Sequence, residues 1–426
     1  MSDFSAQVSE CASEGWKAVP LADLASFRTG PFGSTFHKSD YRSGGVPLIN
    51  PSHIIDGEIV PDEQVAVAPE LASSLSVFAL RENDIVIGRR GDMGRCAVVR
   101  SHQAGFLCGT GSMIVRPRSG VSPELLQAFL ASPRAIAKIE ENSVGTTMIN
   151  LNQGTLSSLE ILLPDNERGQ QAIAAALSDA DGVVAGLERV IAKKRLIKQG
   201  AMQDLLTARR RLAGWGDPTS EHVKVPKGWI NVALSMLADF RTGPFGSTFH
   251  KSDYKRGGVP LINPSHIVDG EIIPDEAIAV SPDLAHKLSV FALQENDIVI
   301  GRRGEMGRCA VVTNQHVGFL CGTGSMIVRP KENGNSQLLR AYLASRAVIE
   351  KIEESSVGTT MINLNQTTLS SLELMVPEEP KEQQAIAAVL SDMDAEIQTL
   401  ESRLTKARAI KEGMMQNLLT GRVRLV

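Results

Sequence analysis

Arginine, asparagine and small hydroxyl residues gather beside glycines in three stretches of the chain, within 28–38, 89–90 and 146–152. Arginine and asparagine can form bidentate hydrogen bonds with base edges, whereas serine, threonine and lysine can hold phosphates. These side chains therefore predict contacts with duplex DNA. The candidates are Arg28, Thr29, Ser34, Thr35, His37, Lys38, Arg89, Arg90, Thr146, Asn150 and Asn152. Any one of them could instead be a solvated turn residue, but the set as a whole favours recognition.

The candidates occur twice because the chain from Trp16 onward is one segment written twice without a gap. The offset is 213 residues, so that Trp16 corresponds to Trp229 and Leu212 to Leu425. The second set is Arg241, Thr242, Ser247, Thr248, His250, Lys251, Arg302, Arg303, Thr359, Asn363 and Asn365. A repeat of this length is domain-sized. We expect an internal pseudo-two-fold suited to a bipartite target such as duplex DNA.

Motifs that would support catalysis are incomplete. The glycine-rich stretch 29–35 lacks the Gly-Lys-Ser/Thr ending of a phosphate loop. The stretch 106–112 resembles the glycine-rich loop of methyl-donor enzymes, but no acidic residue follows at a useful distance. At 49–54, Ser52 and His53 stand where a base-flipping methyltransferase needs proline and an aromatic residue. We therefore predict no catalytic residue, no metal ligand and no cofactor of its own in this chain.

Composition indicates an ordinary globular protein, with 42% hydrophobic and 22% charged residues among 426. The net charge of −4 does not by itself indicate nucleic-acid binding, so the positive charge must act locally. The five cysteines lack Cys-x-x-Cys spacing, which favours buried thiols over a zinc site or disulfides. Neither a spanning apolar run nor a signal-like leader is evident, which predicts a cytoplasmic location.

Each repeat begins with a mixed part that must position the polar stretches. Short β-branched runs at 84–91, 95–100 and 112–117 predict strands, and 159–164 predicts a closing strand. One helix is expected over 123–144, with Ser122 as its N-cap and proline in its first turn.

A long helix is expected to follow in each repeat, because apolar residues alternate there by four and three, as in a coiled-coil seam. The seam positions are Ile173, Leu177, Ala180, Val184, Leu187 and Ile191, and then Ile386, Leu390, Met393, Ile397, Leu400 and Leu404. One such helix cannot cover its own stripe, so the two should pair. The predicted class is α+β, with two mixed α/β domains alternating with two long helices that pair as an antiparallel coiled coil.

The expected boundaries follow from these changes in pattern. They are an N-terminal extension 1–15, a mixed domain 16–166, a spacer helix 167–207, a linker 208–228, a second mixed domain 229–379, a second spacer helix 380–420 and a tail 421–426.

The chain resembles the specificity subunits of type I restriction–modification systems over nearly its whole length. The most specific shared string, QQAIAxxLSDxD followed by IKxGxMQxLLTxRxRL, spans 170–212 and 383–425. The others are GPFGS with a following tyrosine, GVPLIN, NDIVIGRRG and SVGTTMINLNQ, in this order and twice.

This resemblance implies a non-catalytic subunit with two target-recognition domains. It further implies two modification subunits that carry S-adenosylmethionine and methylate adenine, and restriction subunits that use ATP and Mg²⁺. The helices would dock the modification subunits. Family members usually carry two dissimilar recognition domains, whereas these two are nearly identical, which predicts an interrupted palindrome as the target. The alternatives are a stand-alone DNA methyltransferase and a coiled-coil adaptor with two identical protein-binding domains.

Overall fold

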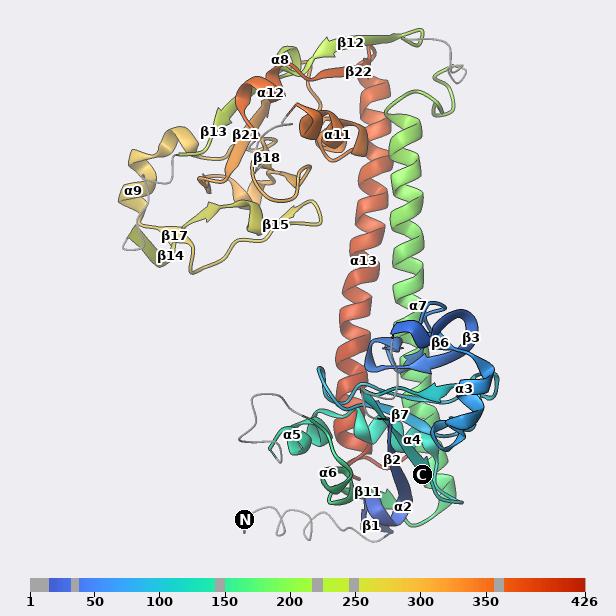
Figure 1. Cartoon of the computed structure of the whole chain (residues 1–426). Coiled ribbons are helices and arrows are strands. Elements are labelled where there is room, and N and C mark those ends of the chain that lie inside the picture. Colours follow the sequence, from blue (N-terminus) through green and yellow to red (C-terminus); the bar gives the residue numbers. More distant parts are fainter. Residues whose placement is uncertain are drawn as a thin grey trace. The chain divides into compact units, whose positions relative to one another are not determined.

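The computed structural model describes residues 15–31, 38–141, 150–216, 225–244, 253–355 and 364–425. It divides into two compact units, Met1–Glu188 with Ser402–Val426, and Arg189–Glu401. The division falls inside both long helices, α7 (Glu167–Leu205) and α13 (Pro380–Leu418). Each unit therefore holds one mixed domain together with part of each long helix (Figure 1).

The described residues of the first mixed domain form four small sheets. The four-stranded sheet has the order β2-β10-β7-β8, the three-stranded sheet has the order β6-β3-β9, and two further pairs are β1-β11 and β4-β5. Their bounds are β1 Trp16–Pro20, β2 Ala25–Thr29, β3 Tyr41–Ile49, β4 Ile54–Ile55, β5 Glu58–Ile59, β6 Ala66–Val67, β7 Ile85–Gly88, β8 Cys96–Val98, β9 Leu107–Cys108, β10 Ser112–Pro117 and β11 Glu160–Pro164. The helices are α2 Leu21–Leu24, α3 Pro69–Ser74, α4 Pro123–Leu130, α5 Pro133–Glu141 and α6 Gln153–Ser157.

The second unit repeats this arrangement strand for strand, with sheets β13-β21-β18-β19, β17-β14-β20, β12-β22 and β15-β16. Its strands are β12 Trp229–Ala233, β13 Ala238–Thr242, β14 Tyr254–Ile262, β15 Ile267–Val268, β16 Glu271–Ile272, β17 Ala279–Val280, β18 Ile298–Gly301, β19 Cys309–Val311, β20 Leu320–Cys321, β21 Ser325–Pro330 and β22 Glu373–Pro377. Its helices are α8 Leu234–Leu237, α9 Pro282–Lys287, α10 Ser336–Leu343, α11 Arg346–Glu354 and α12 Gln366–Ser370.

Strand β7 shows why its residues form a continuous apolar run. Ile85 and Ile87 belong to one buried cluster, whereas Val86 belongs to another. Successive side chains of a strand point to opposite faces, so this strand is covered on both sides. A strand buried on both faces needs apolar residues at every position rather than at alternate ones.

The helix predicted over 123–144 is wrong as a single element, because α4 ends at Leu130 and α5 starts at Pro133. Proline disfavours helical backbone in the residue before it, but that is not the whole cause. In the second repeat Arg346 replaces this proline, and α10 and α11 are still separate. Both breaks share a serine that caps the following helix: Ser132 Oγ accepts from Ala135 N at 3.2 Å, and Ser345 Oγ accepts from Val348 N at 3.4 Å. The serine cap therefore sets the break.

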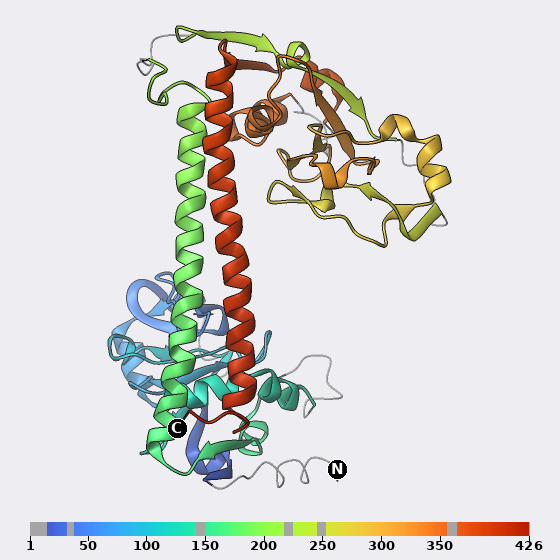
Figure 2. The ribbon, with the colours of Figure 1, turned by 180° about the vertical axis from the view of Figure 1, so that it is seen from behind.

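The two long helices lie side by side and antiparallel, which Figures 1 and 2 show in green and red. In the first unit, Asp181 pairs with Lys411, and Glu188 pairs with Arg408 at 2.6 Å. The second unit contains the repeat equivalents, Lys198 with Asp394 and Arg195 with Glu401 at 2.6 Å. As the residue number rises in one helix it falls in the other, which fixes the antiparallel direction. The predicted α+β class with paired helices is confirmed.

Each helix is 39 residues long, about 58 Å at 1.5 Å per residue. Apolar residues at the start of each helix lie in the core of the neighbouring mixed domain. Ile173 and Leu177 share a buried cluster with Met415 and Leu418 of α13 and with strand residues of the first domain. Farther along, Ile191 and Ile397 are buried, while Val184, Leu187, Leu400 and Leu404 are partly exposed. No helix among the residues that the structure describes is long and apolar enough to cross a membrane.

Candidate nucleic-acid interface

The first two candidate stretches meet at one edge of the four-stranded sheet. Strand β10 pairs antiparallel with both β2 and β7, with Met113 opposite Thr29 and Ser112 opposite Gly88. The carboxyl ends of β2 and β7 therefore lie together, beside the start of β10. Arg28 and Thr29 come from the first end, and Arg89 and Arg90 follow the second. The sequence separates these pairs by about sixty residues, but the sheet brings them to a shared edge.

The glycines at this edge permit close backbone packing. A side chain at Gly30 would collide with the backbone oxygen of Gly109. A side chain at Gly109 would collide with the side-chain amide oxygen of Asn50. Gly30 N also donates to Ser112 O at 3.0 Å. Close packing therefore explains why residue 30, in the stretch that resembles a phosphate loop, is a glycine.

Arg89 is held firmly at this edge. Its backbone N donates to Gly111 O at 2.9 Å, and its Nε donates to Leu151 O at 2.9 Å. Partial burial lowers the pKa of Arg89, and the neighbouring charge of Arg90 lowers it further. Among the described residues, neither arginine forms a salt bridge with a carboxylate. Two adjacent guanidinium groups that no acid in the described part of the chain neutralises favour an anionic partner such as a phosphate.

The third candidate stretch joins the same edge through the start of α6. Leu151 N donates to Arg89 O at 2.9 Å, and Gln153 Nε2 donates to Thr29 Oγ1 at 3.3 Å. Asn150 is exposed here. Asn152 has a structural task, because its Oδ1 accepts from Thr155 N at 2.9 Å and caps α6. The amide nitrogen of Asn152 takes no part in this cap, and the role of Asn152 as a base contact stays a prediction.

The second unit builds the same edge. Arg302 N donates to Gly324 O and Arg302 Nε to Leu364 O, both at 2.8 Å, and burial followed by Arg303 lowers the pKa of Arg302. Asn365 caps α12 through Thr368 N at 2.8 Å. The units are not identical in every contact. Gln366, the equivalent of Gln153, donates to Phe240 O at 3.1 Å, and Arg241 Nη1 donates to Val290 O at 2.7 Å. That bond orients one candidate guanidinium in advance. Thr242 ends β13 opposite Met326, and Arg303 is exposed.

Several candidates lie outside the described residues. These are Ser34, Thr35, His37, Thr146, Ser247, Thr248, His250, Lys251, Thr359 and Asn363. Lys38 opens the short turn Lys38–Asp40, and only its backbone is described. Their roles stay predictions.

The structure adds contacts that the sequence did not predict. Gln153, a polar residue beside Asn152, donates to Thr29 Oγ1. Asp84 is 1% exposed and accepts two hydrogen bonds from Arg116, at 2.7 Å each, so that it links β7 to β10 at the end of β7 opposite Arg89. The second unit repeats this pair with Asp297 and Arg329. Nothing in the spacing of these residues shows that they meet.

The weak enzymatic motifs have structural roles. His53 is buried, and its Nδ1 lies 3.2 Å from Asn50 N and 3.0 Å from Leu48 O, so it braces a short turn. Burial raises the pKa of Cys96 and of Cys108 to about 12. The four cysteines that the structure describes are buried and free, as predicted. Within the described ranges, no group of three or more histidine, cysteine or acidic residues could hold a metal ion.

Comparison with known proteins matches this architecture. The family model of the type I restriction modification DNA specificity domain matches residues 13–194 and again residues 226–407. The MjaVIII type I restriction enzyme specificity subunit of Methanocaldococcus jannaschii is 21% identical over 97% of this chain and 94% of its own length. The EcoBI specificity subunit of Escherichia coli is 19% identical over 95% of this chain and 85% of its own.

A solved structure shares the fold. The crystal structure of the type I restriction–modification S subunit of M. genitalium superposes with a TM-score of 0.59 at 16% identity, covering 95% of this chain and 96% of that one. The chain belongs to the family of type I restriction–modification DNA specificity proteins, and it carries two copies of the family domain. The specificity subunits that it resembles are covered over 94% and 85% of their own lengths.

Proposed function

We propose that this subunit binds duplex DNA through its two mixed domains and directs adenine methylation to a bipartite site. The observation that carries this proposal is the repeated sheet edge, where Arg89 and Arg302 are held in the same way by Leu151 and Leu364. Pre-oriented arginines that pair with no acid in the described ranges suit hydrogen bonding to guanine edges or phosphates. The matching geometry of the two copies supports matching half-sites, and hence an interrupted palindrome.

In this proposal the chain has no catalytic role. Two modification subunits would supply the S-adenosylmethionine site, and restriction subunits, where present, would use ATP and Mg²⁺. The long helices offer a docking surface for the modification subunits, since Leu196, Ile197 and Ile410 are 69%, 47% and 63% exposed. Exposed aliphatic side chains on paired helices favour a protein partner rather than solvent.

Methylome sequencing of the host, with and without a deletion of this chain, tests the proposal. We expect one interrupted palindromic motif with methylated adenine, lost in the deletion strain. Two unrelated half-sites would overturn the palindrome, and an unchanged methylome would overturn the DNA-targeting role.

Two assays on purified protein test whether this chain recognises DNA while the modification subunits transfer the methyl group. The chain alone should not transfer a labelled methyl group to DNA, whereas the complex with modification subunits should. A gel shift should show preference for the motif over random duplex. Salt-sensitive binding by the full complex without any preference would contradict the proposed specificity.

A further inference from the structure

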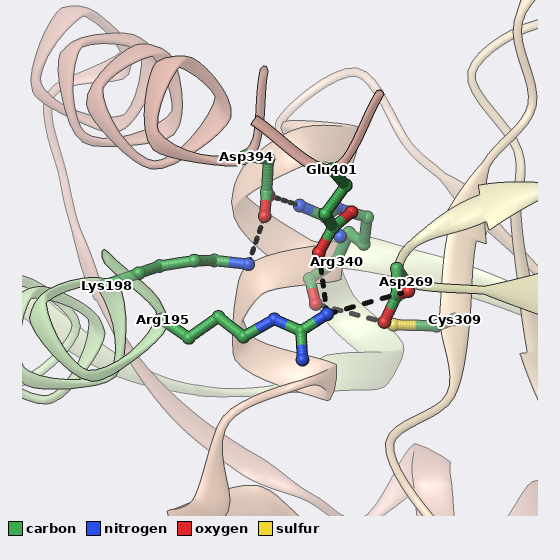
Figure 3. Close-up of polar contacts among 7 residues, drawn as sticks. All are labelled: Arg195, Lys198, Asp269, Cys309, Arg340, Asp394 and Glu401. Atoms are coloured by element: carbon green, nitrogen blue, oxygen red, sulfur yellow. Dashed lines mark hydrogen bonds and ion pairs between the residues drawn. The ribbon is translucent and has the colours of Figure 1, made fainter. Parts of the chain in front are cut away.

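The two mixed domains are attached to the long helices by different side chains. In the second unit, Arg340 of α10 reaches α13 and forms an ion pair with Asp394, which also pairs with Lys198 of α7 (Figure 3). The position equivalent to Arg340 in the first unit is Gln127. Its Nε2 donates to Gly57 O at 2.9 Å and to Cys96 O at 3.2 Å, both within its own domain.

The exposure of the two acceptor carboxylates reflects this difference. The side chain of Asp394 is 17% exposed, whereas that of its equivalent, Asp181, is 56% exposed. Among the described residues, Lys411 is the single ion-pair partner of Asp181. The second domain therefore covers its helix carboxylate, and the first does not.

A second residue of α10, Tyr342, strengthens the same attachment. Tyr342, two residues after Arg340, donates through its hydroxyl to Leu206 O at 3.3 Å and to Met375 O. The residue equivalent to Tyr342 in the first unit is Phe129, which has no hydroxyl. Arg340 itself is 8% exposed and lies against Gly270, where a side chain would collide with the guanidinium. The contact is therefore built into the domain and is not a chance surface pair.

Both domains also attach through apolar residues, Ile173 and Leu177 in one and Ile386 and Leu390 in the other. Asp181 and Asp394 lie one helical turn beyond Leu177 and Leu390. An apolar patch has little directional preference, whereas an ion pair one turn farther along limits rotation about that patch.

We propose that Arg340 is a positioning residue that, through Asp394, fixes the orientation of the second recognition domain on the helices, while the first domain retains freedom to adjust. The consequence for DNA rests on the function proposed above: one half-site is read from a fixed domain and the other from an adjustable one. Arg340 therefore limits the spacer lengths that the subunit accepts.

The internal repeat provides a matched test of the structural part, in the full-length chain with Cys11→Ser. Spin labels replace Lys193 and Glu295 in the second unit, or their equivalents Lys406 and Glu82 in the first; all four are exposed. We expect a narrower distance distribution in the second unit. Arg340→Gln should broaden it to the width of the first, and Arg340→Lys should keep it narrow. Gln127→Arg should narrow the first, because Asp181 is in place to receive it.

Equal widths in the unsubstituted chain, or no response to Arg340→Gln, would overturn the proposal. If Arg340→Gln does not fold, two other variants test the proposal. Asp394→Asn removes the partner of Arg340, and Gln127→Arg introduces the arginine in the first unit.

The DNA part is tested with the complex of this chain and its modification subunits. Duplexes carry the half-sites found by methylome sequencing, at the natural spacer and at one base pair more or less. Arg340→Gln should lower the preference for the natural spacer about tenfold, and Gln127→Arg should raise it. An unchanged spacer profile would remove the role in specificity. If the methylome reveals no site, the proposed function fails, but the spin-label widths still decide the positioning role.

Discussion

Arg89 and Leu151 hold each other through two hydrogen bonds although 62 residues separate them. Leu151 N donates to Arg89 O, and Arg89 Nε donates to Leu151 O, each at 2.9 Å. The second unit repeats the arrangement with Arg302 and Leu364. This exchange fixes the backbone and the guanidinium plane of the arginine together, which leaves its terminal nitrogens directed by the fold rather than by a flexible side chain.

Replacing Arg89 and Arg302 together by alanine should weaken binding of the methylation complex to its motif. A bidentate base contact contributes about 1–3 kcal/mol of discrimination, so we expect a loss of about tenfold or more in motif preference. Competition gel shifts with motif and random duplexes measure it. The matched control is Lys17→Ala with Lys227→Ala, which removes the same charge from exposed positions outside the interface. Unchanged preference in the arginine variant would exclude both residues as base contacts.

Asn152 caps α6 and is also a predicted DNA contact, and substitution can separate these two roles. Asn152→Ala should lower the free energy of unfolding by about 1 kcal/mol because α6 loses its cap, whereas Asn152→Ser should retain most of the stability. Urea unfolding measures this difference. If the amide nitrogen contacts DNA, Asn152→Ser will lose motif binding at unchanged stability. Full binding by the serine variant would limit Asn152 to capping.

The buried ion pair between Arg211 and Glu382 should matter far more than the exposed pairs along the helices. Their side chains are 10% and 3% exposed, and the guanidinium donates to both carboxylate oxygens. Glu382→Ala should therefore cost about 3–5 kcal/mol, because it leaves a buried charge without a partner. The control, Glu188→Ala, breaks the pair with Arg408, which is 61% exposed, and should cost less than about 1 kcal/mol. Urea unfolding measures both losses. Similar losses of unfolding free energy in the two variants would contradict this ranking.

Stability should fall in alkaline solution because of the buried thiols. Burial raises the pKa of Cys96 to about 12 and that of Cys309 to about 11, above an ordinary value near 9. Above that ordinary value the unfolded chain releases protons that the folded chain retains. Each thiol therefore removes about 1.4 kcal/mol per pH unit between its unfolded and folded pKa. Stability is unaffected by these groups below pH 8.

Urea unfolding at pH 8, 9 and 10 checks this dependence. Cys96→Ala with Cys309→Ala should give a flatter decline than the unsubstituted chain. An identical decline in the two proteins would mean that other groups cause the alkaline loss.

The duplication of the chain, the strand runs and the long helices were predictable from sequence because each is a local pattern or a comparison of the chain with itself. Short apolar runs located β7, β8, β10 and β11, and the four-three alternation located α7 and α13. The break between α4 and α5 was missed because the apolar pattern continues across it. The hydroxyl of Ser132 caps α5 and so starts a new helix within that pattern.

The sequence by itself also determined the family, because its strings recur in order and twice. Only the tertiary structure decided which polar residues meet. Asp84 with Arg116, Arg89 with Leu151 and Arg340 with Asp394 are all distant in sequence, and their contacts depend on strand register and helix packing. The repeats are nearly identical, so the sequence does not show that the difference between Gln127 and Arg340 matters. This difference changes how the domain attaches to the helices because the fold places the carboxylate of Asp394 within reach of Arg340.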